Sequence, residues 1–413
     1  MSDDRFDDVR RDATLRDIAE LLRERYVMPG AVPGIVERLE AGARARRYDV
    51  GEPALFAEIV GSDLRETSRD KHLGVRFDPA ANAALRAPGR RPGQLDEAAL
   101  EAVRRIHYGL VEQRLLEGNV RYLRITDFDW VPGSTDVAYD SAVRFLRDAD
   151  AVVIDLRGNV GGEPLAVQYL VSHFLEPDVP VMTFVEAGSE TEDRSLTSLP
   201  AGRLVGMPLY VLIDGHTYSA GEAFAYHVRE FGLGEVVGET TAGAAHVNER
   251  LPVGSEFVLS VSYGRPVHPV TGTSWEGTGV TPTVEAPAGE ALDVAHALAL
   301  ERLAAGAPSE ELRAEYLWAR VAVEARRSPP APPDEATLAS HAGFYGPADV
   351  VLKDGRLWLL RPGRHDFCLD PLSDDGLYGA RGNGRLRVRF EPGRMLLYPG
   401  PGAQPLEYRR TEG

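Results

Sequence analysis

Two apolar runs, each followed at once by a turn and a helical pattern, place the strongest constraint on the fold of this chain. "AVVIDLR" at 151–157 and "PLYVLID" at 208–214 are continuous apolar runs, which is typical of strands buried on both faces. Amphipathic helical patterns follow both runs. Because strands that alternate with helices assemble into parallel sheets covered by helices, we predict an α/β core with a largely parallel sheet.

The rest of the chain predicts one further part on each side of this core. Between residue 11 and about 70, apolar residues recur at helical spacing, as Leu15, Ile18 and Leu22 do. After the proline-rich linker "SPPAPP", short β-like pieces alternate with Gly and Asp turns, which indicates a small all-β domain. We therefore predict three domains: a helical cap domain at 1–112, an α/β core at 113–327 and a small β-barrel-like domain at 334–413.

Smaller features complete the expected organisation. "HLGVRF" alternates like a short strand, and the Pro- and Gly-rich residues 79–95 predict a mobile loop. The polar residues 186–203 predict a second loop.

Composition excludes several classes of partner. The formal net charge is −17, so the surface repels nucleic-acid backbones and anionic membranes. We find no run of about 18 apolar residues that could span a bilayer, and the charged N-terminus is unlike a secretory signal. Cys368 is the single cysteine, which excludes an intramolecular disulfide and a cysteine metal cluster. We expect a cytoplasmic protein without nucleic-acid or membrane partners.

The stretch "LIDGHTYSAGEAFAYHV" at 212–228 raises the first functional question. It starts as a strand, bends at Gly215 and continues as a helix, with Ser219 at the bend. Such a bend resembles a nucleophile elbow, which would project Ser219 from the sheet and leave the Ala220 N–H free as a donor. The alternative is a serine that only caps the helix, which is the commoner role at this position.

A glycine-rich stretch, "DLRGNVGG", follows the first buried run. Gly158, Gly161 and Gly162 would let the backbone approach a ligand and direct N–H groups at it. Such a loop could bind an oxyanion or a phosphate. The lysine and serine or threonine of a P-loop are missing, so nucleotide binding is the weaker alternative. A tight strand-to-helix turn without further function is equally compatible with the pattern.

Taken together and in order, "DLRGNVGG", "YSAGEAFAY" and "GETTAG" resemble the motifs of the C-terminal processing (tail-specific) serine proteases. "SRDKHLGVRF", "LLEGNVRYLRI" and "GRPVHPVTGTSWEGTGVTP" are more similar to one branch, which includes the repeat unit of interphotoreceptor retinoid-binding protein and the tricorn protease core. The resemblance covers roughly residues 11–300. It implies a crotonase-like or ClpP-like αββ core.

The chain also departs from the tail-specific pattern. Those proteases use a Ser/Lys dyad with the lysine after "GE-x-T", and here Ala244 stands in that place. The segment from Phe77 to Arg114 is too short for the PDZ domain that usually precedes their core. A standard processing protease is therefore not expected.

The tricorn-like arrangement implies a different set of catalytic groups. By resemblance, His72 is the base, Glu276 is the carboxylate that orients it, and the amides of Gly162 (or Gly161) and Ala220 stabilise the oxyanion. Taken alone, His72 could equally be a structural histidine, and Glu276 could anchor a turn.

Several neighbouring residues remain accessory candidates. Lys71 stands where tricorn has a serine, and it is either solvated or tunes His72. His246 is a competing base, and His216 and His268 are weaker ones. No His/Cys/Asp set has the spacing of a metal site. We predict no metal and no cofactor.

These residues give two classes of function. The first is a serine hydrolase that cleaves peptide-like amide bonds through an acyl-enzyme at Ser219, acting on a peptide or a peptide-like small substrate. With another nucleophile in place of water, the same site would be an acyltransferase or a cyclase. The second is a non-catalytic binding module for apolar ligands, as in the retinoid-binding relatives. A homo-oligomer is compatible with either.

Overall fold

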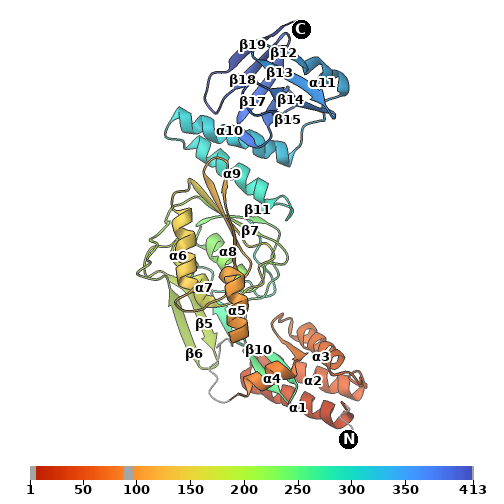
Figure 1. Ribbon diagram of the computed structural model, residues 1–413. Helices are drawn as coiled ribbons and strands as arrows, with labels where there is room; N and C mark the ends of the chain where they lie inside the picture. The colour runs from red at the N-terminus through yellow and green to blue at the C-terminus, as the bar shows by residue number, and fades with distance from the viewer. Residues whose placement is uncertain (1–5, 88–96, 412–413) are drawn as a thin grey trace.

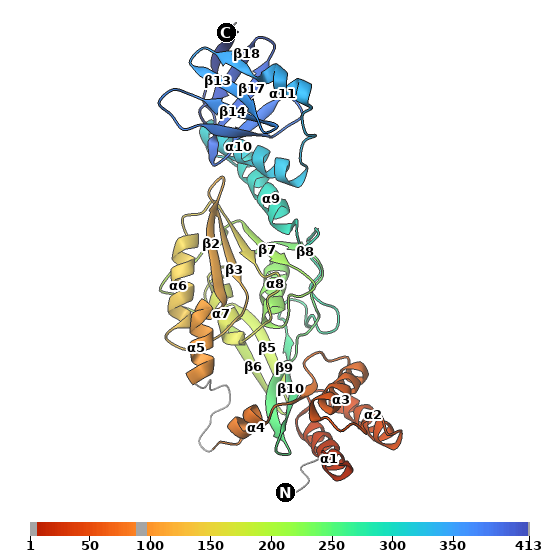
Figure 2. The same ribbon diagram turned by 45° about the vertical axis from the view of Figure 1, so that its right-hand side comes forward.

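The computed structural model describes residues 6–87 and 97–411, which form three parts in chain order (Figure 1). Figures 1 and 2 show helices of the N-terminal part at one end, a mixed α/β core in the middle and a β-barrel at the other end. The predicted sequence of helices, α/β core and small β domain is confirmed at this level. Among the described residues, no helix has both the length and the apolar composition that crossing a bilayer requires.

The N-terminal part is a group of three helices that shares its core with strands of the central part. Its helices are α1 (Asp8–Arg25), α2 (Val32–Arg44) and α3 (Pro53–Ser68), with a 3-10 turn η1 (Pro29–Ala31) between the first two. Their buried side chains, among them Ile18, Leu22 and Phe56, form one cluster with Phe257 and Leu259. The helices therefore pack directly on the core.

The connection from α3 back to the core is short. Arg69 ends α3 with φ of 61°, in the left-handed region, and β1 (Gly74–Phe77) then pairs antiparallel with β10 (Phe257–Val267), with Gly74 opposite Ser260. Residues 70–73 are thereby held between a helix end and a sheet. His72 lies in this connection.

The prediction of a loop at 79–95 is wrong for the first half of that range. Residues Pro79–Leu85 form a helix, α4, because the Asp78 side chain caps it by accepting from the Ala81 N–H and Pro79 suits its first turn. The rest of the predicted mobile loop, residues 88–95, falls outside the described residues. After them come α5 (Glu97–Arg105) and a 3-10 turn, η2 (His107–Gly109).

The central sheet has the predicted parallel character. Its order is β11-β8-β7-β4-β3-β2, and every pair is parallel except β2 with β3. The strands are β2 (Leu110–Leu116), β3 (Val120–Ile125), β4 (Ala151–Asp155), β7 (Leu209–Ile213), β8 (Gly234–Gly238) and β11 (Val284–Glu285). All residues of β4 and β7 are buried, as their continuous apolar runs predict.

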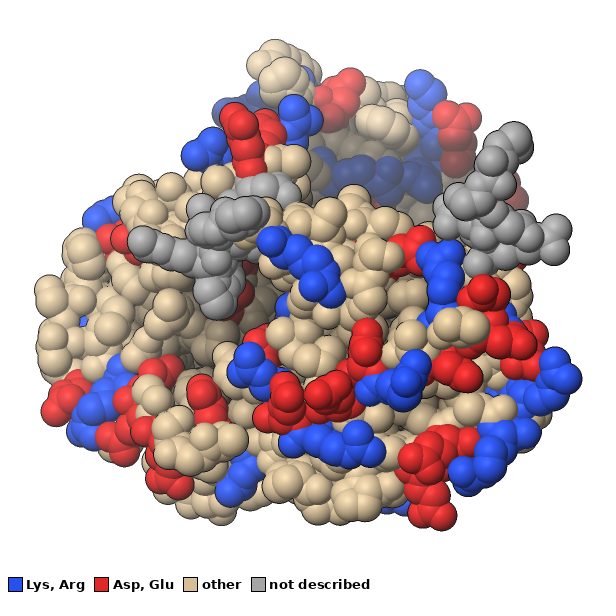
Figure 3. Space-filling model, turned by 90° about the horizontal axis from the view of Figure 1, so that it is seen from below, with Lys and Arg blue, Asp and Glu red and all other residues tan. Residues whose placement is uncertain are grey.

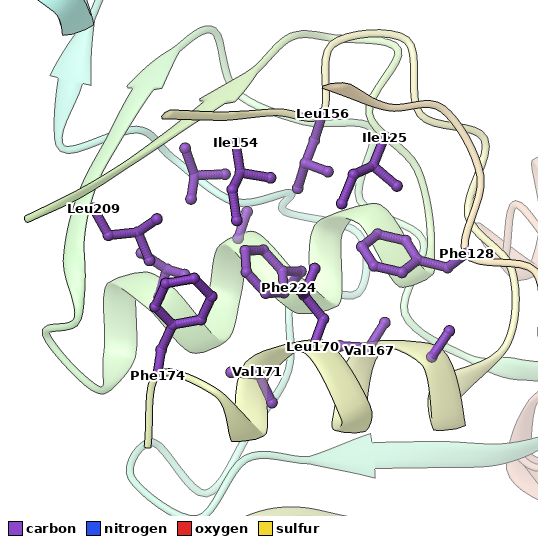
Figure 4. Close-up of a cluster of buried hydrophobic side chains, with 14 of the residues drawn as sticks. Ile125, Phe128, Ile154, Leu156, Val167, Leu170, Val171, Phe174, Leu209 and Phe224 are labelled. Carbon is purple, nitrogen blue, oxygen red and sulfur yellow. The ribbon is translucent and has the colours of Figure 1, made fainter. Parts of the chain in front are cut away.

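Helices cover both faces of this sheet. One face packs on α6 (Thr135–Leu146), α7 (Pro164–Ser172) and α8 (Ala220–Glu230), where Phe224 lies between Ile154 of β4 and Leu170 of α7 (Figure 4). The other face packs on α9 (Ala291–Ala305) and α10 (Glu310–Arg327). Because alternate residues of a strand point to opposite faces, β3, β4, β7 and β8 each contribute to both clusters.

A second sheet, which the sequence did not predict as a unit, joins the core to the N-terminal part. It is antiparallel, with order β1-β10-β5-β6 and with β9 (Val247–Val253) also paired to β10. β5 (Pro180–Glu186) and β6 (Ser189–Arg194) form a hairpin around Gly188, so part of the loop predicted at 186–203 is a strand. β6 is an edge strand with mostly exposed polar side chains, and its sequence therefore lacks an apolar alternation.

The C-terminal part is a closed barrel preceded by a short helix, α11 (Glu335–His341). Its eight strands are β12 (Gly343–Tyr345), β13 (Ala348–Lys353), β14 (Arg356–Leu360), β15 (Phe367–Pro371), β16 (Leu377–Ala380), β17 (Asn383–Glu391), β18 (Arg394–Tyr398) and β19 (Leu406–Thr411). Apolar side chains such as Val350, Leu359, Val388 and Met395 are buried in one cluster. The interior is thus a packed core.

The barrel is attached to α10 through an arginine and a tryptophan. The guanidinium carbon of Arg387 lies 3.9 Å from the ring centroid of Trp318, and Arg387 also donates to the Trp318 carbonyl. The Trp318 indole in turn donates to the Gly384 carbonyl at 2.8 Å. Burial lowers the pKa of Arg387 to about 10, and the charge of Glu117 opposes this shift. Trp318 therefore stabilises a buried cation at the junction.

Replacing this tryptophan should loosen the junction. For Trp318→Ala we expect the free energy of unfolding to fall by about 1–3 kcal/mol, because a cation–π contact and a hydrogen bond are lost and Arg387 is left less well compensated. Thermal unfolding and the rate of proteolysis in the linker at 328–333 measure the effect. Leu317→Ala, at a largely exposed neighbouring position, is the control. Equal behaviour of the two variants would contradict the role of Trp318.

Candidate active site

Ser219 lies at the sharp bend between β7 and α8. Its φ of 49° and ψ of −116° fall in a region that residues with a side chain rarely adopt. The Ser219 N–H donates to the Glu222 carboxylate at 2.9 Å. A strained backbone persists only where surrounding contacts hold it, so the contacts of Glu222 are part of the site.

Glu222 is fully buried and accepts four hydrogen bonds. Besides the Ser219 N–H, its donors are Thr241 Oγ1 at 2.5 Å, the Gly243 N–H at 2.6 Å and the Ala244 N–H at 2.9 Å. Burial raises the pKa of Glu222, and these hydrogen bonds oppose the shift. The sequence analysis did not single out Glu222. A glutamate three residues after a helix-capping serine is the signature of a capping box, which could have identified its local role but not its tertiary partners.

His72 reaches Ser219 from the other end of the sequence. Its Nε2 lies 3.2 Å from Ser219 Oγ although the two residues are 147 positions apart. The His72 ring packs against the Tyr218 ring, with centroids 5.0 Å apart. Its Nδ1 is buried and has no hydrogen-bond partner among the described residues. Burial lowers the pKa of His72 to about 4; the charge of Asp70 opposes this shift and His246 adds to it. His72 is therefore neutral at physiological pH.

Asp70 connects His72 with His246, and the sequence analysis did not single it out. One carboxylate oxygen accepts the His72 backbone N–H at 2.9 Å, and the other lies 3.0 Å from His246 Nδ1. Burial raises the pKa of Asp70, but the hydrogen bond and charge of His246 and the hydrogen bond from the His72 N–H together outweigh it, so the net shift is downward. For His246, burial lowers the pKa, but the bond to Asp70 and the charges of Glu276 and Asp70 raise it overall. Asp70 and His246 thus form a buried ion pair.

Glu276, the predicted orienting carboxylate, contacts a loop and not the His72 ring. One of its oxygens accepts the Ala245 N–H at 2.6 Å and the His246 N–H at 3.1 Å, and it lies 3.9 Å from His246 Nδ1. Burial raises the pKa of Glu276, while His246 opposes the shift. Glu276 therefore belongs to the same cluster as Asp70 and His246, one side chain removed from His72.

The glycine-rich loop lies against Ser219, as its sequence predicts. A Cβ on Gly161, which has φ of 94°, would come within 2.7 Å of the Ser219 Cβ and 3.3 Å of the Ala220 nitrogen, so only glycine fits there. The Gly161 N–H donates to the Asn159 side chain at 2.9 Å. Within the described residues, no hydrogen bond uses the N–H groups of Gly162 or Ala220. Of the two glycines proposed for the oxyanion, Gly162 is the one with a free donor.

Asn159 holds this arrangement together and also escaped the sequence analysis. It is fully buried. Its side-chain amide donates to the Ile125 backbone carbonyl at 2.9 Å. The backbone carbonyl of Asn159 accepts the Tyr218 N–H at 2.9 Å. The glycine loop and the Ser219 bend are thereby fixed to one another.

The structure also places the remaining candidates. Lys71 is exposed, and its ammonium donates to the Ala242 carbonyl. Ala244 is buried, with its N–H on Glu222 and its carbonyl on the Trp275 indole. His216 is exposed. His268 is buried and packs against the Phe231 ring, with centroids 4.6 Å apart.

One group in the described residues has the donor types of a metal site. Ligand atoms of Asp70, His246 and Glu276 lie within 4.8 Å of one another. A divalent cation could use two carboxylates and an imidazole. It would, however, have to displace the bond between Asp70 and His246 Nδ1, so the arrangement fits an ion pair better than a metal centre.

Comparisons with known proteins identify similar peptidases. The model of peptidase family S41 matches residues 119–286. The carboxy-terminal processing protease CtpB of Bacillus subtilis is 27% identical over 175 residues, which cover 42% of this chain and 35% of that protein. The nisin-resistance protein of Lactococcus lactis is 25% identical over 212 residues, covering 47% of this chain and 65% of the relative.

A solved structure shares the fold. Mature CPAF superimposes with a TM-score of 0.51 at 12% identity, covering 73% of this chain and 99% of that one. The chain matches between about a third and two thirds of the length of the curated relatives. The order of motifs and the family match lead to one conclusion: residues 119–286 match peptidase family S41, and the chain is similar to the carboxy-terminal processing proteases.

Proposed function

We propose that this chain is a serine peptidase that cleaves peptide-like amide bonds through an acyl-enzyme on Ser219. The observation that carries the proposal is the 3.2 Å contact between His72 Nε2 and Ser219 Oγ, at a strained bend flanked by free amides. A serine hydroxyl needs a neutral base within hydrogen-bond reach and donors for the oxyanion. The site offers both.

The proposed mechanism follows from these positions. Ser219 Oγ attacks the substrate carbonyl while its proton passes to His72 Nε2. The N–H groups of Gly162 and Ala220 stabilise the negative charge on the tetrahedral oxygen. His72 then gives its proton to the leaving amine, and water, activated by the same imidazole, releases the acid and regenerates Ser219.

In the proposed mechanism, the carboxylates of Asp70 and Glu276 have different roles. When His72 takes a proton it becomes a cation, and the nearby charge of Asp70 favours that cation. Asp70 also fixes the His72 backbone. Glu276 fixes the 245–246 amides and faces His246. The site is thus tricorn-like in using a histidine, with Ala244 in the place of the dyad lysine, and the core is interpreted as crotonase-like.

The alternatives differ in what they require. A carrier of apolar ligands needs no histidine at the serine, so the contact between His72 and Ser219 favours the enzyme. An acyltransferase or cyclase would use the same serine and acyl-enzyme. It differs only in the nucleophile that resolves the intermediate, and mass spectrometry of the products distinguishes it from a hydrolase.

Removing the nucleophile is the direct test. We expect Ser219→Ala to abolish labelling by a fluorophosphonate probe and to lower peptide hydrolysis by roughly a thousandfold or more, because no acyl-enzyme can form. Labelling is read by gel fluorescence, and hydrolysis by mass spectrometry of a short-peptide library. Ser340→Ala, on α11, is the control and should label like the wild type. Hydrolysis that survives in Ser219→Ala would refute the proposal.

The pH dependence of labelling tests the role of His72. The base must be neutral, and burial lowers its pKa to about 4, so reactivity is present above that value and is lost as the pH falls through it. We expect the second-order rate of fluorophosphonate labelling to change little between pH 7 and pH 5.5. A free histidine with pKa near 6.5 would instead lose most of its reactivity over this interval. That second result would place the base elsewhere.

The variants Asp70→Asn and Glu276→Gln separate the two carboxylates. Both variants retain an oxygen that can accept the backbone N–H groups and remove a charge. Asp70→Asn also replaces the oxygen that faces His246 Nδ1 by an amide NH2 group. Because the Asp70 charge raises the pKa of His72, we expect Asp70→Asn to move the acid limb of the labelling profile to lower pH and to reduce kcat about tenfold. Glu276→Gln should leave the acid limb in place. The reverse order of effects would restore Glu276 as the carboxylate that acts on His72, and Tm values show whether either variant is merely unstable.

A further inference from the structure

Three acidic side chains lie beside the glycine-rich loop. Phe128 forms a parallel β-bridge with Gly162, and the Glu163 N–H donates to the Phe128 carbonyl at 2.7 Å. The Phe128 ring points into the core (Figure 4). Because successive side chains of an extended segment alternate in direction, Asp127 and Asp129 flank Phe128 on the side away from that core, with Glu163 on the adjoining segment.

The three carboxylates influence one another. The pKa of Asp129 is raised, first by burial and then by the charges of Asp127 and Glu163. The Glu163 side chain reaches the surface, yet the surrounding protein still raises its pKa, and no cation opposes the shift. In the described part of the chain, no side-chain hydrogen bond or ion pair involves any of the three. They therefore form a set of like charges without a counter-ion.

This set differs from the other acidic groups of the site. Glu222 accepts four hydrogen bonds, and Asp70 is paired with His246. On the face shown in Figure 3, acidic and basic side chains are interspersed. Like charges held together without a cation cost stability, and such a cost is typical of a functional site.

A buried tyrosine next to the aspartates is a second, independent observation. The Tyr139 side chain is fully buried, and its hydroxyl has no hydrogen-bond partner within the described residues. Burial raises the pKa of Tyr139, and the charges of Asp129 and Asp127 raise it further. The hydroxyl therefore faces these two aspartates. Leaving a buried hydroxyl unpaired costs free energy, and a donor bound between the aspartates would recover it.

The spacing of these groups favours an organic cation over a metal ion. A metal ion needs several ligand atoms around one point. Among the described residues, one group of three ligand side chains is compact enough for that, and it is the ion-pair cluster around His246. More widely spaced carboxylates suit a lysine ammonium or an arginine guanidinium, whose N–H groups point in several directions.

The carboxylates are within reach of a substrate at the proposed nucleophile. A Cβ on Gly161 would come within 2.7 Å of the Ser219 Cβ, and the next N–H, that of Gly162, is a proposed oxyanion donor. Glu163 follows directly, and Asp129 lies opposite it at about the 5 Å spacing of paired segments. Lysine and arginine carry their charge on three or four methylene groups, so such a side chain close to the reacting carbonyl can reach this set.

We propose that Asp127, Asp129 and Glu163 bind the cationic side chain of a peptide substrate. The bound residue is a lysine or an arginine within about two positions of the cleaved bond, given the reach of such side chains. The proposal rests on the peptidase function proposed above and specifies its substrate class. The formal net charge of −17 is in keeping with it, because it attracts basic peptides.

Binding to the inactive Ser219→Ala protein tests this subsite without requiring turnover. Three libraries of N-acetylated hexapeptide amides serve as probes, with uncharged residues at every position except the third. That position is lysine in the first library, arginine in the second and norleucine, an uncharged residue of similar length, in the last. Ultrafiltration and mass spectrometry measure how much of each library the protein retains.

We expect at least about tenfold greater retention of the lysine or the arginine library than of the norleucine library, the size of effect that a charge-assisted hydrogen bond gives. Adding Asp129→Asn or Glu163→Gln should reduce this difference several-fold, because each removes one of the charges that bind the cation. Asp366→Asn, at an exposed position of the barrel, is the matched control and should retain it.

Thermal unfolding distinguishes a binding role from a structural one. Because the three like charges repel one another, Asp129→Asn and Glu163→Gln should leave Tm unchanged or raise it. A fall in Tm in both variants would assign these carboxylates to the stability of the fold and would contradict the proposal.

Other outcomes also overturn it. Equal retention of all three libraries, retention of none, or a preference that persists in both variants would each exclude a cation subsite here. An increase in Tm when calcium is added to the wild type, absent in Asp129→Asn, would identify a metal ion in place of the peptide cation.

Fluorophosphonate labelling of the protein with Ser219 intact separates failure of the subsite from failure of the peptidase proposal. Labelling without a preference for the cationic libraries removes only the subsite. A preference without labelling leaves a peptide-binding site and removes the enzyme.

Discussion

The buried carboxylate of Glu222 is the interaction on which the site depends. It accepts hydrogen bonds from the Ser219 N–H, the Thr241 hydroxyl and the amides of Gly243 and Ala244. A bend with φ of 49° at a serine is strained, and Glu222 holds it by tying the start of α8 to the loop that follows β8. Because the carboxylate is fully buried, loss of any one donor would leave it poorly compensated.

A second set of contacts brings the histidine from the N-terminal part to that serine. β1 pairs with β10, and the buried side chains of the three helices form one cluster with core residues such as Phe257. Asp70 then fixes the His72 backbone and pairs with His246 of the core. The N-terminal helices and the core therefore complete the site jointly.

Local patterns allowed much of the fold to be predicted. The runs at 151–157 and 208–214 contain the buried strands β4 and β7, and the helices before residue 70 follow from their spacing. β6 was missed because an exposed edge strand carries no apolar alternation. α4 was missed because the prolines and glycines of residues 79–95 are typical of a loop. The helix at Pro79–Leu85 depends on its cap, the Asp78 side chain. The extents predicted for the three domains, with boundaries at 112 and 327, remain predictions.

The sequence by itself determined which chemical groups are present: a serine at a strand-to-helix bend, glycines that permit close approach, a histidine, a glutamate and no lysine at position 244. Only the tertiary structure decided how they are paired. Ser219 and His72 are 147 positions apart in the sequence and in contact in the structure. The Gly161 N–H donates to the Asn159 side chain. Asp70, and not Glu276, accepts the His72 backbone N–H. A sequence motif indicates which backbone conformation a short segment requires. Hydrogen bonds between distant segments depend on how helices and sheets pack, which a motif does not show.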